Sequence, residues 1–525
     1  MSADKPKPTQ PPSDSADPDV PAVARDDPPL AWDEPDPVGI FVLTDQSGWD
    51  ALAARYPTDW EVPLTRCLEV ARRSGAISAV VETRYIDLDY RSEYSAFYSR
   101  TFPSIPDSAH RIHFFSTIVG REALWDGASD GSYLGYVVVR PSELGRVGRT
   151  LLKPPPGHFD SVRTSVIDHV NFLGRTLQVE GVPFAQQDTQ LGRCAHAAAW
   201  VCHFSAHKRG DVARRAMAEF PLSANPGLGL GRPLPSGGLT VQQILELFRV
   251  FDLPAAFYKV KELPTQPPLP WMPEVDDPQP SSTTDGEVNA SALVSICCRY
   301  LNSGFPVLVG TSSHAFVLCG YSRTKRNGQD WITFIRHDDQ RGLYLEVDDV
   351  LNDVDPATGD KYGPWQYLIV PLPDKLWLSA EAAESRGAQM LWALATEAAP
   401  HVSEAGLLID LAPERLALRT YATTANSFKA RLDRGLDPTL IREYRLARFS
   451  RYVWVVEAVD RDLRSKAEPC VVGEVVLDAT SSDTQPEPLA VHVPGLAAVH
   501  RTKGPPRFPI RCSVDPYRTG GVGPC

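Results

Sequence analysis

The sequence has no long hydrophobic run. No stretch of its 525 residues approaches the roughly 18 consecutive apolar residues that a membrane-spanning helix requires. The first residues also lack the apolar block and small-residue cleavage site of a secretory signal. We therefore expect a cytoplasmic protein with no membrane partner.

Cysteine is scarce, and basic residues are fewer than acidic ones. Nine cysteines are too few for a disulfide scaffold and odd in number, so reduced thiols are the expectation. Lys and Arg total 53 against 65 Asp and Glu, which gives a formal net charge of −12. Binding to a phosphate backbone requires charge of the opposite sign, which argues against nucleic acid as a partner.

Signatures of nucleotide and metal binding are missing as well. The glycine-rich run at 227–231 is not followed by the Lys-Ser/Thr of a phosphate-binding loop. His196, His203 and His207 fall on one side of a predicted helix, but no carboxylate or CxxC pair completes a zinc set. We expect no cofactor and no metal, and interpret these histidines as a solvated or domain-packing face.

The chain is too long for a single hydrophobic core, so several domains are expected. Residues 1–37 hold ten prolines and nine acidic against three basic residues, a composition typical of disorder. Seven prolines between Pro264 and Pro280 exclude a helix or an inner strand there. The predicted organisation is a disordered tail (1–37), an N-terminal α/β or α+β domain of unknown role (38–180), a middle domain (181–373) with a proline-rich insert (264–290), a C-terminal α+β domain (374–495) and a flexible tail (496–525).

Two patterns define the C-terminal domain. Ser379 precedes a long stretch of helix-forming residues and is a plausible N-cap. The runs 452–459 and 470–477 are rich in β-branched residues and predict a pair of neighbouring strands. The economical interpretation is a helix packed on a sheet.

The segment around Cys194 points to chemistry. Gly192 and Arg193 end an irregular stretch, and the residues from Cys194 onward are good helix formers. Cys194 is therefore expected at a helix N-terminus, where backbone N–H groups and the helix dipole favour a thiolate, the nucleophilic form of cysteine. The same helix is expected to be amphipathic, with the cysteine at its buried side.

A histidine and a carboxylate follow at the ends of predicted strands. An apolar strand at 306–309 and a tight turn through Gly310 place His314 at the leading end of the next strand. A polar turn at 322–329 returns the chain as WITFIRHD, which ends at Asp338. A carboxylate on this adjacent strand is expected to hold one imidazole nitrogen and leave the other free to take the thiol proton.

In these three pieces the sequence resembles the papain-like cysteine peptidases in the broad sense. That group includes papain, the leader peptidases that trim exported bacterial peptides, and transglutaminase-like enzymes. The resemblance covers about 181–373. It implies an α+β papain-like core, with a helix carrying Cys194 and an antiparallel sheet carrying His314 and Asp338, flanked by two further α/β or α+β domains.

The resemblance also implies roles. Cys194 is the nucleophile, His314 the general base and acid, and Asp338 the orienting residue, with an upstream glutamine completing an oxyanion hole. The family's glutamine usually lies six positions before the cysteine, but that position here is Asp188. Gln187 and Gln190 flank it, and Gln190 is the preferred candidate because it stands nearer the helix start.

The predicted function is a cysteine peptidase that cleaves an amide bond of a peptide or protein through a thioester on Cys194. Transfer of the acyl group to an amine, as in a transglutaminase-like enzyme, is the related option. The alternative from another class is an inactive papain-like module that acts in protein–protein interaction. Substrate identity and oligomeric state do not follow from the sequence.

Overall fold

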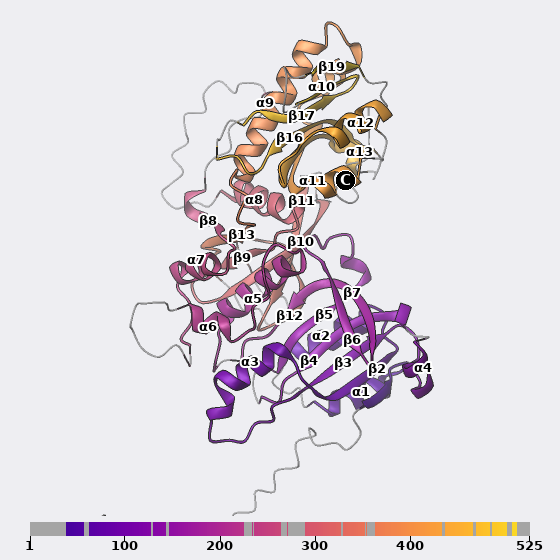
Figure 1. Ribbon diagram of the computed structural model, residues 1–525, viewed down its shortest axis with the longest axis vertical. Coiled ribbons are helices and arrows are strands. Elements are labelled where there is room, and N and C mark those ends of the chain that lie inside the picture. Colours follow the sequence, from indigo (N-terminus) through magenta and orange to yellow (C-terminus); the bar gives the residue numbers. More distant parts are fainter. Residues whose placement is uncertain are drawn as a thin grey trace, which may run out of the picture.

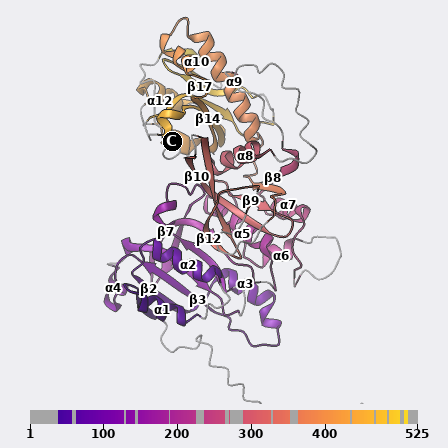
Figure 2. The same ribbon diagram turned by 180° about the vertical axis from the view of Figure 1, so that it is seen from behind.

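The computed structural model is a mixed α+β protein built on three antiparallel sheets, which follow one another along its long axis (Figures 1 and 2). The predicted tail 1–37 and most of the predicted insert 264–290 lie outside the described residues. The structure describes residues 38–56, 62–127, 130–142, 146–188, 190–224, 234, 236–263, 270, 289–326, 329–351, 353, 363–432, 436–465, 469–482, 486–500 and 507–511.

The first sheet has seven strands in the order β1-β2-β3-β4-β5-β7-β6. Because side chains alternate between the two faces of a strand, Val81 packs with the helices α1 and α2, whereas its neighbour Val80 packs toward α5. The elements of this part are β1 (Val38–Val42), α1 (Gln46–Ala54), α2 (Val62–Arg73), β2 (Ser78–Tyr85), α3 (Leu88–Ala96), β3 (Ala109–Phe115), α4 (Arg121–Asp126), β4 (Tyr133–Val139), β5 (Val147–Leu152), β6 (Val166–Phe172) and β7 (Arg175–Phe184).

The second sheet has six strands in the order β12-β11-β10-β9-β13-β8. Val317 on β10 belongs to the core that contains α5, and Phe316 belongs to the core that contains α8, so one helix covers each face. The elements are α5 (Cys194–Lys208), α6 (Glu219–Ser223), α7 (Val241–Val250), β8 (Ala255–Lys259), α8 (Ala290–Asn302), β9 (Val307–Gly310), β10 (Ala315–Arg326), β11 (Gln329–Asp338), β12 (Gly342–Val347) and β13 (Tyr367–Pro371).

The third sheet has six strands in the order β14-β15-β16-β17-β18-β19. Two expectations are confirmed: Ser379 caps α9 by accepting from Ala382 N at 3.2 Å, and β15 pairs with β16 in antiparallel fashion. The elements are α9 (Ala380–Ala398), α10 (Leu407–Asp410), β14 (Leu416–Thr424), α11 (Ala425–Ala430), α12 (Pro438–Leu446), β15 (Tyr452–Asp460), α13 (Arg461–Ser465), β16 (Val471–Asp478), β17 (Pro488–Val493), β18 (Leu496–Val499) and β19 (Arg507–Arg511).

Three expectations need correction. Strand β7 runs across the predicted boundary between residues 180 and 181, because Thr150 to Leu152 of β5 pair with its last residues. The predicted tail begins with β18, whose apolar side chains are buried, and continues with β19, so part of it completes the third sheet. Cys470, buried next to β16, is disulfide-bonded, contrary to the expectation of reduced thiols.

Within the described residues, no helix combines the length and the apolar character needed to cross a bilayer.

The first and second sheets meet at Gly320. Val162 forms an isolated β-bridge with Gly320, Tyr321 N donates to Ser161 O at 2.8 Å, and Arg163 N donates to Cys319 O at 2.9 Å. A Cβ atom on Gly320 would lie 2.2 Å from Ser161 O. Only glycine therefore lets this loop of the first part cross β10.

We predict that Gly320→Ala destabilises the protein by about 1–3 kcal/mol, because a backbone oxygen cannot move aside as a flexible side chain does. Urea unfolding at equilibrium measures the change. Gly131→Ala is the matched control, since a Cβ there meets nothing within 4 Å. Equal stability of both variants would show that the crossing is not tightly packed.

Candidate active site

Cys194 is the first residue of α5, as the sequence indicated. Arg193 before it is extended, with φ −124° and ψ 173°, and its N–H donates to His196 Nδ1 at 3.1 Å. The preceding loop is closed by Asp188, whose Oδ1 accepts from Leu191 N at 2.9 Å and from Gly192 N at 2.8 Å. Local hydrogen bonds thus fix where the helix begins and hold the thiol half-buried at its mouth.

His314 lies at the turn between β9 and β10, directly before the first residue of β10. Thr311 closes the turn: its N–H donates to His314 O at 2.9 Å, and its Oγ1 accepts from His314 N at 3.1 Å. Both the N–H and the carbonyl group of His314 are therefore held by Thr311. The residue as a whole is 9% exposed.

Asp338, the last residue of β11, holds the imidazole. Its Oδ1 lies 3.1 Å from His314 Nε2 and also accepts from Gln340 N at 3.0 Å. Asp339 Oδ1 lies 3.8 Å from the same nitrogen. The strand β11 ends at Asp338, so the alternation of side chains along a strand does not decide where Asp339 points.

The protonation of the cluster follows from burial and from these contacts. Burial alone would lower the pKa of His314, but the hydrogen bonds with Asp338 and Cys194 outweigh it and raise that pKa to about 10. Burial would raise the pKa of Asp338, but the bond from His314 holds it below its usual value. Burial and the charge of Asp338 raise the pKa of Asp339 to about 8. Near neutral pH the arrangement favours an imidazolium, one carboxylate and one carboxylic acid.

His314 thus uses Nε2 for Asp338, and its second ring nitrogen is left for the thiol of Cys194, with which the ring interacts. Nucleophilic chemistry by a thiol needs a base that contacts the sulfur and a third group that contacts and orients the base. The three side chains have these contacts. The structure brings together all three residues that the sequence singled out.

Cys194 and His314 line a cavity of about 550 Å³. The walls come from the loop before α5, the start of α7, the turn before β10 and the first residue of β13. The lining residues are Gln187, Arg193, Cys194, Ala195, Gly237, Gly238, Leu239, Thr240, Gln243, Thr311, Ser312, Ser313, His314, Ala315, Gln340 and Tyr367.

The two candidate glutamines lie in different surroundings. Gln187 lines the cavity, and its backbone interacts with the carboxyl group of Asp339. Gln190 is exposed and is not among the lining residues. Asp188, at the family's usual position, is turned inward and bound by Tyr98 Oη. Proximity along the chain favoured Gln190, but the loop closed by Asp188 brings Gln187 to the cavity instead.

The expected amphipathic character of α5 is wrong. His196 and His203 are buried, as are nearly all residues of the helix, because α5 lies between the first and second sheets. Burial lowers the pKa of His196 to about 4 and that of His203 to about 3, so both rings are neutral. His196 contacts Ser236, and His203 packs against the rings of Phe220 and Phe251, so these two histidines do not form a solvated face.

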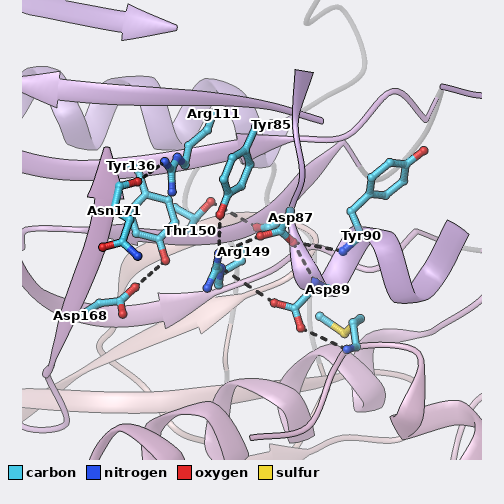
Figure 3. A network of polar contacts seen from close by, with 12 residues as sticks. Tyr85, Asp87, Asp89, Tyr90, Arg111, Tyr136, Arg149, Thr150, Asp168 and Asn171 are labelled. Carbon is cyan, nitrogen blue, oxygen red and sulfur yellow. Dashed lines mark hydrogen bonds and ion pairs between the residues drawn. The ribbon is translucent and has the colours of Figure 1, made fainter. Parts of the chain in front are cut away.

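A network of polar side chains around Arg149 lies on the first sheet (Figure 3), and Trp200 links it to α5. Arg149 donates to Tyr85 Oη at 2.9 Å and to Asp87 Oδ2 at 2.8 Å, and its Nε lies 3.9 Å from Asp89 Oδ2. Asp89 in turn accepts from Trp200 Nε1 of α5 at 3.3 Å. The network therefore ties the helix that carries Cys194 to strand β5.

A second contact of this kind lies farther along α5. Asp168 of β6 pairs with Lys208 in the last turn of α5 and accepts from Tyr136 Oη at 2.7 Å. The helix α5 is therefore bound to Asp89 of α3 near its middle and to Asp168 of β6 in its last turn. These contacts fix the helix along its length as well as at its start.

Several cavity residues belong to no motif that sequence analysis could identify. Gly237 to Thr240 come from a distant segment, and Tyr367 comes from β13. A Cβ on Gly310 would lie 1.9 Å from the Tyr367 ring, so the ring rests on this glycine. Because Gly310 and Tyr367 are 57 positions apart, no local sequence pattern predicts that they are in contact.

The site also offers ligand atoms for a cation. His314, Asp338 and Asp339 each place one such atom within 4.8 Å of the others. A bound cation would have to replace the hydrogen bond between His314 and Asp338. The cluster thus serves either a metal or the thiol, and its contact with Cys194 favours the thiol.

No protein-family model matches this chain, and no curated protein matches it. The chemical interpretation of the site therefore depends on its geometry.

We predict that Asp338→Ala lowers the pKa of His314 by about one unit or more, because it removes the bond that raises that pKa to about 10. The imidazolium exists below its pKa, so in the variant it is lost at a lower pH. Titration of the ring resonances in histidine-labelled protein measures the shift, with His314→Gln for assignment. Asp339→Asn, which removes no direct bond, is expected to shift the pKa less. A larger shift in Asp339→Asn would exchange the roles of the two aspartates.

Proposed function

We propose that the middle part of the chain is a papain-like thiol enzyme that cleaves an amide bond of a peptide or protein. The observation that supports this most is the convergence of Cys194, His314 and Asp338 at one cavity, from three separate segments of the chain. A core cysteine would need neither a buried carboxylate nor an open space beside it.

In the proposed reaction the thiolate of Cys194 attacks the carbonyl carbon of the substrate. The carbon–nitrogen bond breaks, the leaving amine takes a proton from His314, and a thioester remains on Cys194. Water then gives a proton to His314 and its hydroxyl group to the acyl carbon; the carbon–sulfur bond breaks, which releases the acid and restores the thiolate and the imidazolium. If an amine takes the place of water, the product is a new amide, as in acyl transfer.

The other residues of the site support these steps. Asp338 holds the ring of His314 through Nε2, which directs the second nitrogen toward the sulfur and the leaving group. Backbone N–H groups at the start of α5 lie next to Cys194, and Gln187 is one of the residues that line the same cavity. Together they are suitable donors for the oxyanion that forms during attack.

We predict that Cys194 is the fastest-reacting thiol of the folded protein near neutral pH. Alkylation with limiting iodoacetamide followed by peptide mapping measures the rate at each cysteine. Cys67, Cys202, Cys297, Cys298 and Cys319 are internal controls, since they are buried and burial raises the pKa of each thiol.

Cys194→Ser is expected to remove both this labelling and any amide hydrolysis, and His314→Gln is expected to slow both strongly. If Cys194 reacts no faster than the buried thiols, catalysis is excluded. The alternative function, an inactive module for protein–protein interaction, would then be the better interpretation.

A second prediction separates the two glutamines. Gln187→Ala is expected to lower kcat by about 100- to 1000-fold, the usual loss for one oxyanion donor. Gln190→Ala is the matched control and is expected to keep kcat within about twofold, because surface substitutions away from a site have small effects. Turnover of a peptide substrate measures both. A large loss of kcat in Gln190→Ala and a small one in Gln187→Ala would instead assign the oxyanion donor to Gln190.

A further inference from the structure

Among the described residues, those that line the cavity include no carboxylate. Among its lining residues the ionisable side chains are Arg193, Cys194, His314 and Tyr367, and most of the others are amides, hydroxyls and glycines. Asp338 and Asp339 contact His314 but are not part of the wall.

Arg193 is held at this wall. Its Nε donates to Ser236 O at 3.2 Å, which links the start of α5 to the segment that leads into α7. Its side chain is exposed, and no carboxylate of the described residues pairs with it. Arg193 and Cys194 line the same cavity, so the guanidinium places a positive charge on the wall that contains the thiol.

Two helix N-termini face the same cavity. Arg193, Cys194 and Ala195 belong to the start of α5, whereas Thr240 and Gln243 belong to the first turn of α7. The N-terminal end of a helix carries a partial positive charge. The dipoles of α5 and α7 therefore add to the charges of Arg193 and of the His314 imidazolium.

We propose that Arg193 makes this site specific for substrates that carry a carboxylate next to the amide bond to be cleaved. The inference rests on the proposed function and adds the substrate class, an acidic peptide. The planar guanidinium presents its outer N–H groups to the carboxylate, as is common in carboxylate recognition. The absence of acidic groups in the described wall leaves nothing to compete with it.

Two small electrophiles of similar size test the charge preference without a peptide. Iodoacetate is an anion and iodoacetamide is neutral, and each alkylates the thiolate with loss of iodide. The measured quantity is the rate of alkylation of Cys194 by iodoacetate divided by its rate of alkylation by iodoacetamide. Arg193→Gln is expected to lower this ratio by about threefold to tenfold, because one nearby positive charge is lost. Arg193→Lys keeps the charge and is expected to retain most of the ratio.

Arg249→Gln is the matched control. Arg249 lies at the far end of α7, paired with Glu246 at 2.6 Å, and its loss changes the net charge equally without touching the cavity. Its ratio is expected to equal that of the unchanged protein. If Cys194 is labelled rapidly but Arg193→Gln leaves the ratio as it was, the specificity proposal is overturned and the proposed function stands. If Cys194 is not labelled preferentially, the proposed function itself fails.

Peptides then distinguish the source of the carboxylate. A library with Glu or Gln at the positions flanking the cleaved bond tests a side-chain carboxylate. Peptides that end in a free carboxylate or in an amide test a terminal one. In both comparisons the acidic member is expected to have the higher kcat/KM, and Arg193→Gln is expected to reduce that preference. Equal use of acidic and neutral members by the unchanged protein would overturn the proposal.

Discussion

The burial of α5 between two sheets is the constraint on which the rest of the structure depends. One side of the helix packs against the first sheet and another against β10 of the second sheet, so the two sheets share one core. Burying a helix on both sides requires partners for its polar groups, and the network around Arg149 and Asp89 supplies them. Breaking such a buried network by removing one partner is costly, because a charge is left without compensation. The first sheet is therefore a structural part of the site.

The protonation of His314, Asp338 and Asp339 is coupled. His314, Asp338 and Asp339 lie within reach of one another, and all are buried. Two adjacent buried carboxylates do not both ionise readily, so the pair retains one proton near neutral pH, which burial and repulsion assign to Asp339. The ionised Asp338 then faces the imidazolium. Asp338, which is hydrogen-bonded to the His314 ring, therefore stays charged because Asp339 is neutral.

Much of this arrangement could be predicted from local sequence. The start of α5 at Cys194, the position of His314 before β10 and the end of β11 at Asp338 each depend on a short pattern of turn and strand residues. The failures share one cause, which is tertiary packing. His196 is buried and contacts Ser236, which lies 40 residues later in the chain, and the place of Gln187 depends on the loop that Asp188 closes. The boundary at 180 failed because strand pairing, which carries no mark in composition, extends β7 to Phe184.

The separation of the site residues along the chain has a consequence during synthesis. The nucleophile proposed at Cys194 emerges from the ribosome about 120 residues before His314, which at about 5–20 residues per second is a delay of roughly 6–24 s. Until β9 and β10 have paired, the thiol lacks the His314 imidazole that contacts it in the folded protein. The order of the elements thus keeps the growing chain from exposing an activated thiol to its own unfolded segments or to neighbouring proteins.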